Sequence, residues 1–277
     1  MKIDKNLVQR TLTGVLLVGV IIGAIMWSPW SSAVLFAIVT ALSVREFHQL
    51  TNGAQTVMPP AVGMVGAVLL FAAAFIYFGQ EICPYNTTWH KYLILSYYAL
   101  ILTVIIAALF HTKGNALNNT ALFMLGQVWI ALPFALLCGI MLQQSWQPIL
   151  LLAFFVIIWS NDTLAYITGS LLGRHRMFER ISPKKSWEGF VGGAIGALAA
   201  SAIFAYSSNT LLLWQWLTFA AIIVIFGTIG DLCESLFKRT LGIKDSGRAI
   251  PGHGGWLDRF DSTLLAAPAV FIFLQLI

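Results

Sequence analysis

The sequence predicts an all-α, polytopic integral membrane protein with about nine transmembrane helices. Its 277 residues are 58% hydrophobic and only 10% charged, and the mean hydropathy is +0.82. A soluble domain of this length carries about 25% charged residues, because water must wet its surface. The charges are too few to cover a water-soluble globule, so lipid must be the solvent for most of this surface.

Windows of roughly 20 apolar residues, the length that crosses a bilayer core, divide the chain into successive spans. The second span is short, because Arg45 and Glu46 end its apolar run. The first follows basic residues, as in a signal peptide, but its apolar run is longer than a signal core. Trp27, Pro29 and Trp30 are also unsuited to a cleavage site, so we expect a retained helix. The predicted spans are 11–29, 31–44, 58–79, 92–110, 120–142, 147–169, 189–207, 211–230 and 262–277.

The distribution of positive charge predicts an orientation. With a cytoplasmic N-terminus and nine crossings, 15 of the 16 Lys and Arg residues fall in cytoplasmic segments, and only Lys91 lies outside. Because positive residues are retained on the cytoplasmic side, this partition supports both the orientation and the number of spans. It places the C-terminus on the far side of the membrane. Topology thus accounts for the net charge of +5, and we expect no nucleic acid partner.

Residues 1–277 are expected to form one membrane domain with an uneven distribution of chemistry. Eight of the eleven carboxylates lie after residue 160. Residues 1–145 form apolar helices with short connections, whereas residues 146–277 add two long polar loops, 170–188 and 231–261. Two spans separate these loops, so both fall on the cytoplasmic face, where we expect the functional site.

The densest polar segment runs from Gly230 to Ser262. If the preceding helix continues past the membrane, Asp231, Ser235 and Lys238 recur at i, i+4 and i+7 and share one face. Six glycine and proline residues then interrupt regular structure, and glycines let backbone N–H groups approach an anion. Asp258 and Asp261 follow at i and i+3, near the start of the last span.

This mixture of carboxylates, cations and glycines suits a polyphosphate with a bound metal. Mg²⁺ prefers one or two carboxylates, with phosphate oxygens and water completing its coordination, while Lys and Arg neutralise the remaining phosphate charge. The alternative is a topogenic loop in which acids merely pair with retained cations. Asp231, Asp258 and Asp261 lie at the ends of apolar spans, where charge is costly and usually functional, so we favour the functional interpretation.

Three further features lie upstream. Asp162 is inside an apolar span, where it either bonds a neighbouring helix or faces the substrate. Lys184 and Lys185 either retain their loop in the cytoplasm or contribute cations to the site. Gly192-x-x-x-Gly196, extended by neighbouring glycines, predicts close packing of two helices.

The segment after Gly230 resembles the signature of the bacterial-type phosphatidate cytidylyltransferases, also called CDP-diacylglycerol synthases. One departure is Trp256, where the family has an aliphatic residue. The similarity extends upstream through Asp162 and the stretch 182–189, and covers about the C-terminal 40% of the chain. The matching signature residues are Ser235, Phe237, Lys238, Arg239, Lys244, Asp245, Gly247, Ile250, Pro251, His253, Gly254, Gly255, Asp258, Arg259 and Asp261.

The resemblance implies a nucleotidyltransferase of phospholipid biosynthesis in the bacterial cytoplasmic (inner) membrane, with its active site facing the cytoplasm. The implied reaction is CTP plus phosphatidic acid giving CDP-diacylglycerol and pyrophosphate, assisted by Mg²⁺. By the same resemblance, Asp231, Asp258 and Asp261 are metal ligands, and the catalytic set adds Ser235 and Lys238. The implied substrate and phosphate contacts are Asp162, Ser182, Lys184, Lys185, Arg239, Lys244, His253, Gly254, Gly255 and Arg259.

Alternatives remain open at this stage. A CTP-dependent enzyme acting on another lipid acceptor has the same requirements, because the sequence does not show the lipid pocket. A transporter would place ionisable groups at mid-membrane on several helices, whereas here the acids gather towards one face. A second metal ion and a homodimer are also left open.

Overall fold

The computed structural model describes residues 5–53, 56–82, 88–110, 114–143, 145–247, 249 and 254–277, with side chains from residue 11 onward. Helices dominate it, and the prediction of an all-α polytopic membrane protein is confirmed. Within the described ranges, the helices long and apolar enough to cross a membrane number seven: Pro29–Thr51, Pro60–Phe78, Trp89–Phe110, Ala116–Met141, Pro148–Leu172, Trp187–Ser207 and Leu213–Thr240.

Two further predicted spans also coincide with helices. The first corresponds to α1 (Lys5–Trp27), whose apolar part Thr11–Trp27 is shorter. The last corresponds to α10 (Leu257–Leu276). The exact number of crossings and their orientation stay predictions.

The chain divides into two compact units. The first comprises Met1–Trp146 with Asp245–Phe260, and the second comprises Gln147–Lys244 with Asp261–Ile277. Segment 245–260, which carries a portion of the signature, therefore groups with the N-terminal helices. The predicted organisation as one domain with halves 1–145 and 146–277 stays a prediction.

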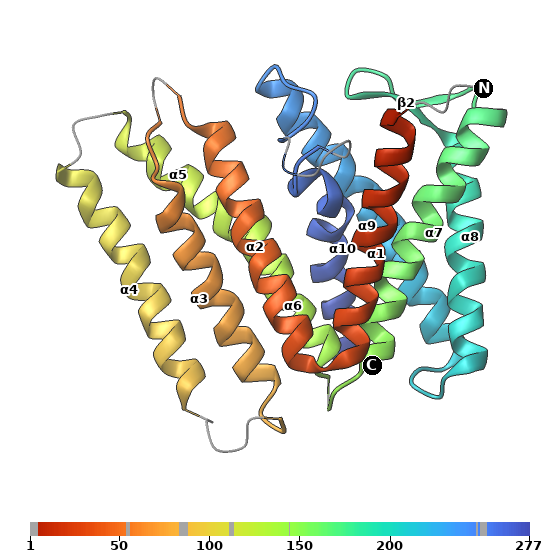
Figure 1. Cartoon of the computed structure of the whole chain (residues 1–277), viewed down its shortest axis with the longest axis horizontal. Helices are drawn as coiled ribbons and strands as arrows, with labels where there is room; N and C mark the ends of the chain where they lie inside the picture. The colour runs from red at the N-terminus through yellow and green to blue at the C-terminus, as the bar shows by residue number, and fades with distance from the viewer. Residues whose placement is uncertain are drawn as a thin grey trace. The chain divides into compact units, whose positions relative to one another are not determined.

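The first unit is a set of apolar helices in which each packs against its neighbours in the chain, so that α2, α3 and α4 lie side by side (Figure 1). Pro29 begins α2 at a position where its missing N–H is not needed, and the Ser28 hydroxyl accepts the N–H of Ser31 at 3.1 Å. Besides α1, the elements are α2 (Pro29–Thr51), α3 (Pro60–Phe78), α4 (Trp89–Phe110), α5 (Ala116–Gly126), the π-helix η2 (Gln127–Ala131) and α6 (Leu132–Met141).

Helix α2 does not stop at the charged pair that limited the predicted second span. It continues through Arg45 and Glu46 to Thr51. Arg45 is exposed, whereas Glu46 is only 7% exposed because protein surrounds it. The end of the apolar run did not predict the end of the helix, because a charged side chain that is hydrogen-bonded inside the protein can lie within a helix.

The π-helix has a local cause in the sequence. A proline in a helix clashes with the carbonyl four residues earlier, and Pro133 follows η2 closely. The N–H of Leu132 bonds to the carbonyl of Gln127 instead, which widens the preceding turn.

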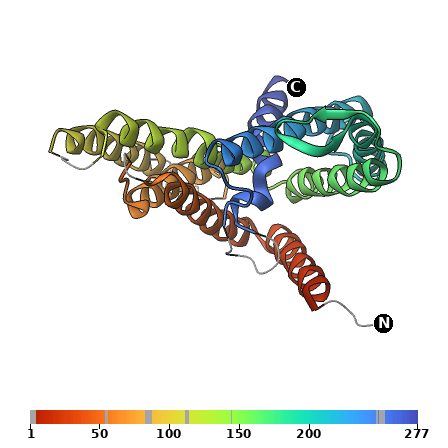
Figure 2. The same ribbon diagram turned by 90° about the horizontal axis from the view of Figure 1, so that it is seen from above.

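The second unit packs α7 against α8 and α9. A two-stranded antiparallel sheet joins α7 to α8 (Figure 2) and pairs Arg176 with Ser186 and Phe178 with Ser182. This hairpin lies inside the predicted loop 170–188, for which no strand was expected. The elements are α7 (Pro148–Leu172), β1 (Arg176–Phe178), β2 (Ser182–Ser186), α8 (Trp187–Ser207), α9 (Leu213–Thr240) and the portion of α10 from Asp261 onward.

Glycines bring α7 and α8 into close contact, as the Gly192-x-x-x-Gly196 spacing predicts. A Cβ on Gly189 would lie 2.8 Å from the carbonyl oxygen of Ala165, and one on Gly193 would lie 2.7 Å from Asn161 Oδ1. These distances are shorter than van der Waals contact, so the backbones approach only because side chains are missing. A similar approach occurs in the same unit between α9 and α10, where a Cβ on Gly230 would lie 2.7 Å from the carbonyl oxygen of Asp261.

Candidate active site

Helix α9 carries the predicted polar face of the site. The helix runs to Thr240 and contains Asp231, Ser235 and Lys238. The Ser235 hydroxyl donates to Asp231 Oδ1 at 3.3 Å, one helical turn away. Lys238 forms an ion pair with Glu234 at 3.3 Å. The carboxylate of Glu234 is 1% exposed, so Lys238 is held at this helix by a buried acid that was not predicted as a site residue.

Asp231 also receives a cation from the hairpin. Lys185 Nζ on β2 lies 2.6 Å from Asp231 Oδ2. Both side chains are about one third exposed or less, so water screens this pair only partly. The two oxygens of Asp231 therefore contact one hydroxyl and one ammonium, and the predicted residues Asp231, Ser235 and Lys185 are brought together.

Further carboxylates surround Asp231 in the second unit. Asp261 lies in the first turns of α10 and is partly buried. Its carboxylate is near enough to the negative charges of Asp231, Glu234 and Asp162 to be repelled by them. Asp162 Oδ1 also accepts the side-chain N–H of Asn161 at 3.3 Å. Mutual repulsion of this kind favours the binding of a cation or a proton.

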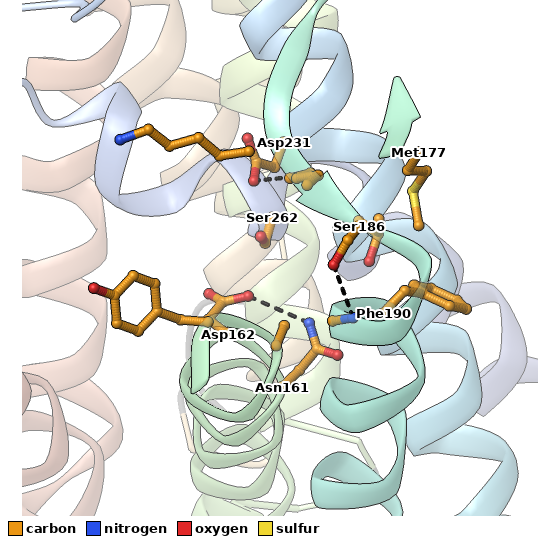
Figure 3. Close-up of a pocket in the computed structure, with 13 residues that line it drawn as sticks. Asn161, Asp162, Met177, Ser186, Phe190, Asp231 and Ser262 are labelled. Carbon is orange, nitrogen blue, oxygen red and sulfur yellow. Dashed lines mark hydrogen bonds and ion pairs between the residues drawn. The ribbon is translucent and has the colours of Figure 1, made fainter. Parts of the chain in front are cut away.

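A pocket of about 290 Å³ opens beside these groups. Figure 3 shows Asp231 and Asp162 at this pocket, from α9 and α7 respectively, with Ser262 close to Asp231. Apolar surface dominates the lining, with a few charged groups among it, as is usual for a small-molecule site. The lining residues are Asn161, Asp162, Ala165, Tyr166, Met177, Lys184, Lys185, Ser186, Gly189, Phe190, Thr228, Asp231 and Ser262.

The hairpin that carries Lys184 and Lys185 is fixed at its base. Glu188 accepts the backbone N–H groups of Arg174 and His175 at 3.1 and 3.2 Å, and His175 Nδ1 lies 2.6 Å from its Oε1. The Ser186 hydroxyl accepts the N–H of Gly189 and caps α8. These contacts place β2 against the start of α8, while Lys184 stays exposed.

The signature loop before α10 is organised by Asp258 in the first unit. Asp258 Oδ2 accepts the N–H groups of Ser246 and Gly255, both at 2.9 Å. Gly254 has φ +83°, a left-handed conformation that side chains rarely adopt. A Cβ on Gly254 would also meet the carboxylate of Asp258. The N–H of Gly255, expected to contact phosphate, therefore faces Asp258 in this structure.

Glu46 is a second acid at this loop. Its carboxylate accepts the hydroxyl of Ser246 and the N–H groups of Trp256 and Leu257, the last two at 2.9 and 3.3 Å. Glu46 was not predicted as a site residue. The available signal was a carboxylate in an apolar helix, which is costly unless it is bonded.

The remaining predicted contacts are spread over both units. Arg239 donates to the carbonyl of Ile243 at 3.1 Å and so ties the segment that follows α9 to the last turn of the helix. Lys244 and Arg259 are exposed, and Ser182 begins β2. His253 lies outside the described residues.

The predicted aspartates suit a Mg²⁺ site that is completed by substrate. In the described ranges, no group of three or more His, Cys, Asp and Glu side chains is arranged to hold a metal ion by itself. Mg²⁺ usually takes only one or two carboxylates and fills its coordination with phosphate oxygens and water. Asp231 and Asp261, both of the second unit, would supply the two carboxylates of such a site, which stays a prediction. Asp258 belongs to the first unit, and its role as a third ligand stays a prediction.

Fold and site together define a polytopic membrane protein with a pocket of carboxylates and lysines suited to a phosphorylated ligand and its counterion. Residues 8–277 match the model of the cytidylyltransferase family, and the chain belongs to this family. The resemblance found in the sequence is thereby confirmed at the level of the family.

Curated bacterial relatives named phosphatidate cytidylyltransferase are similar over a portion of the chain. The proteins of Staphylococcus haemolyticus and Staphylococcus saprophyticus are both 47% identical over 121 residues, and that of Staphylococcus aureus is 45% identical over the same length. Each alignment covers 43% of this chain and 46% of the relative. The chain thus spans about half the length of the curated relatives it matches.

Proposed function

We propose that the protein is a CTP:phosphatidate cytidylyltransferase that makes CDP-diacylglycerol and pyrophosphate for phospholipid biosynthesis. The observation that carries the proposal is the pocket of the second unit, where Lys185 pairs with Asp231 and where Lys184 and Asp162 also line the cavity. Membership of the cytidylyltransferase family supports the CTP-dependent chemistry. The names of the staphylococcal relatives support phosphatidic acid as the acceptor.

The reaction transfers CMP to the lipid phosphate. A phosphate oxygen of phosphatidic acid forms a bond to the α-phosphorus of CTP, and the bond from that phosphorus to the bridging oxygen of the β-phosphate breaks. Pyrophosphate leaves with the electron pair of that bond. Phosphate monoesters have a second pKa near 6, so the nucleophile is largely ionised at neutral pH, and no residue is needed as a general base.

The protein supplies positioning and charge. Lys185 lies against Asp231 in the pocket and would neutralise phosphate charge when substrate enters. Lys184 stays exposed on the same strand and adds a second cation. Ser235 orients the carboxylate of Asp231 through its hydrogen bond. Preorganised charges of this kind stabilise the charge that develops in a transition state.

Asp231 and Asp261, both of the second unit, would hold Mg²⁺. When bound, Mg²⁺ supplies charge neutralisation for the triphosphate and the leaving pyrophosphate. Lys185 and Asp231 compensate each other's charge in the pocket. Nucleotide and Mg²⁺ would replace this pair by contacts of the lysine with phosphate and of the carboxylate with the cation.

We place the site at the cytoplasmic face of a bacterial inner membrane. The partition of Lys and Arg supports this side, and CTP is available there. The apolar portion of the pocket lining suits a lipid acceptor that arrives from the surrounding leaflet.

The test is pyrophosphate release by the purified protein in nanodiscs with CTP, Mg²⁺ and phosphatidic acid. The Asp231→Asn variant removes one carboxylate charge while keeping the side-chain shape, and we expect turnover to fall about 10²- to 10³-fold. Glu81→Gln, a change at an exposed carboxylate of the first unit, is the matched control and should keep full activity.

The outcomes separate the competing functions. Release that requires all three components and is lost in Asp231→Asn supports the proposal. Release with another phospholipid acceptor, and none with phosphatidic acid, would identify a CTP-dependent enzyme of different lipid specificity. No release with any acceptor from folded protein would reject the activity.

A further inference from the structure

Glu46 makes a set of contacts far from its place in the sequence. It lies near the end of α2, and its hydrogen-bond donors are Ser246, Trp256 and Leu257, about two hundred residues later. All four residues belong to the first unit. The carboxylate is buried, and a buried charge is tolerated only when hydrogen bonds replace its lost water.

The donors explain why a carboxylate occupies this position. Leu257 is the first residue of α10, and Trp256 precedes it, so their N–H groups are among those that a helix start leaves without internal partners. A negative charge at a helix N-terminus is favourable, because the helix dipole points its positive end there. Glu46 thus caps α10 from another helix.

Two signature glycines are required by the same carboxylate. A Cβ on Gly247 would lie 2.9 Å from Glu46 Oε2, and a Cβ on Gly255 would overlap Glu46 Oε1. Both positions were expected to be glycine so that phosphate could approach the backbone. The structure gives another reason, since any side chain there would collide with Glu46.

We infer that Glu46 is a positioning residue that holds Ser246 against the described residues 254–257 of the signature loop and thereby orients Asp258. Two acids hold the loop: Asp258 accepts the N–H groups of Ser246 and Gly255, and Glu46 accepts the adjacent Ser246 hydroxyl and the N–H groups of Trp256 and Leu257. Without Glu46, the carboxylate of Asp258 would still be present, but its position would no longer be fixed. The consequence for catalysis rests on the proposed function.

The test compares Glu46→Gln with Glu81→Gln in nanodiscs, using amide hydrogen exchange and steady-state kinetics. Glutamine keeps the shape and one acceptor oxygen, but it loses the charge and directs an NH₂ group at other donors. We expect amides in a peptide covering 254–260 to exchange roughly tenfold faster or more. The kcat should fall about 10- to 100-fold, with a smaller change in the KM for CTP, because a small misplacement of a catalytic group is costly.

Ser246→Ala keeps the test decisive if Glu46→Gln lowers the yield of folded protein. It removes only the hydroxyl donor and leaves the two backbone contacts of Glu46, so we expect smaller changes in the same direction for both exchange and kcat. Together, the two variants report on the carboxylate and on one of its partners.

Each outcome decides the inference. Faster exchange at 254–260 with a lower kcat supports it. Unchanged exchange in Glu46→Gln would show that the loop is held without the carboxylate and would overturn the inference. Faster exchange with an unchanged kcat would reduce Glu46 to a stabilising residue. A wild-type protein without turnover would reject the proposed function, while exchange would still decide whether Glu46 holds the loop.

Discussion

Substitution of Gly193 by alanine should destabilise the second unit through its α7–α8 contact. The added Cβ would lie 2.7 Å from Asn161 Oδ1, 2.8 Å from the Asn161 carbonyl oxygen and 3.0 Å from Ala165 Cβ. The carbonyl belongs to the backbone and cannot turn aside, so the two helices must separate locally. Overpacking of this kind costs about 1–3 kcal/mol.

Gly23→Ala is the matched control for this prediction. Gly23 is also inside an apolar helix, but nothing lies within 4 Å of the Cβ position. Both variants gain the helix propensity of alanine over glycine, about 1 kcal/mol, so the difference between them isolates the contact.

Thermal unfolding in detergent, followed by tryptophan fluorescence, measures this difference. At about 2–4 °C per kcal/mol for a chain of this size, Gly193→Ala should unfold roughly 2–12 °C below Gly23→Ala. Equal melting temperatures would refute the idea that the glycine seam is tightly packed. Because Asn161 and Ala165 line the pocket, the proposed turnover should fall with stability.

Three further predictions concern the site. Lys185→Gln removes the 2.6 Å contact with Asp231. The kcat/KM for CTP should fall about 10- to 100-fold in the pyrophosphate assay, because a charge-assisted hydrogen bond contributes about 1.5–3 kcal/mol. An unchanged kcat/KM would exclude a phosphate-binding role for Lys185. Ser186→Ala deletes the cap that accepts the N–H of Gly189 and should destabilise the protein by about 0.5–2 kcal/mol; a melting temperature equal to that of wild type would show that the cap is dispensable. Removal of divalent cations with EDTA should abolish turnover and added Mg²⁺ should restore it, because Mg²⁺ is expected to bridge the carboxylates and the triphosphate; undiminished turnover in EDTA would contradict the metal requirement.

Much of the fold follows from hydropathy alone. Apolar windows locate the helices because lipid excludes unsatisfied backbone groups and admits little besides helices and closed barrels. The helix-packing glycines were also identifiable, since Gly192-x-x-x-Gly196 is typical of close helix contacts in an apolar helix. The full length of α2 could not be identified from the sequence, because Arg45 and Glu46 interrupt the hydropathy signal without ending the helix.

The site was less accessible from sequence. Asp231 and Ser235 follow from helical spacing, and the structure joins them by a hydrogen bond. The partners of Lys185 and Lys238 depend on which acid lies nearest in space, and spacing alone could not select Asp231 and Glu234. The hairpin of β1 and β2 was also missed, because its short strands have no apolar alternation to reveal them.

The contacts of Glu46 limit how far the protein can be divided. A fragment starting after residue 146 would retain the complete signature of the family, yet it would lack the acceptor for the N–H groups of Trp256 and Leu257. Chimeras that exchange the N-terminal helices should therefore preserve a carboxylate at this point of α2. The family signature lies in the C-terminal half of the chain. A fragment that folds in the same way must also include Glu46 of α2, because the signature residues depend on its buried carboxylate.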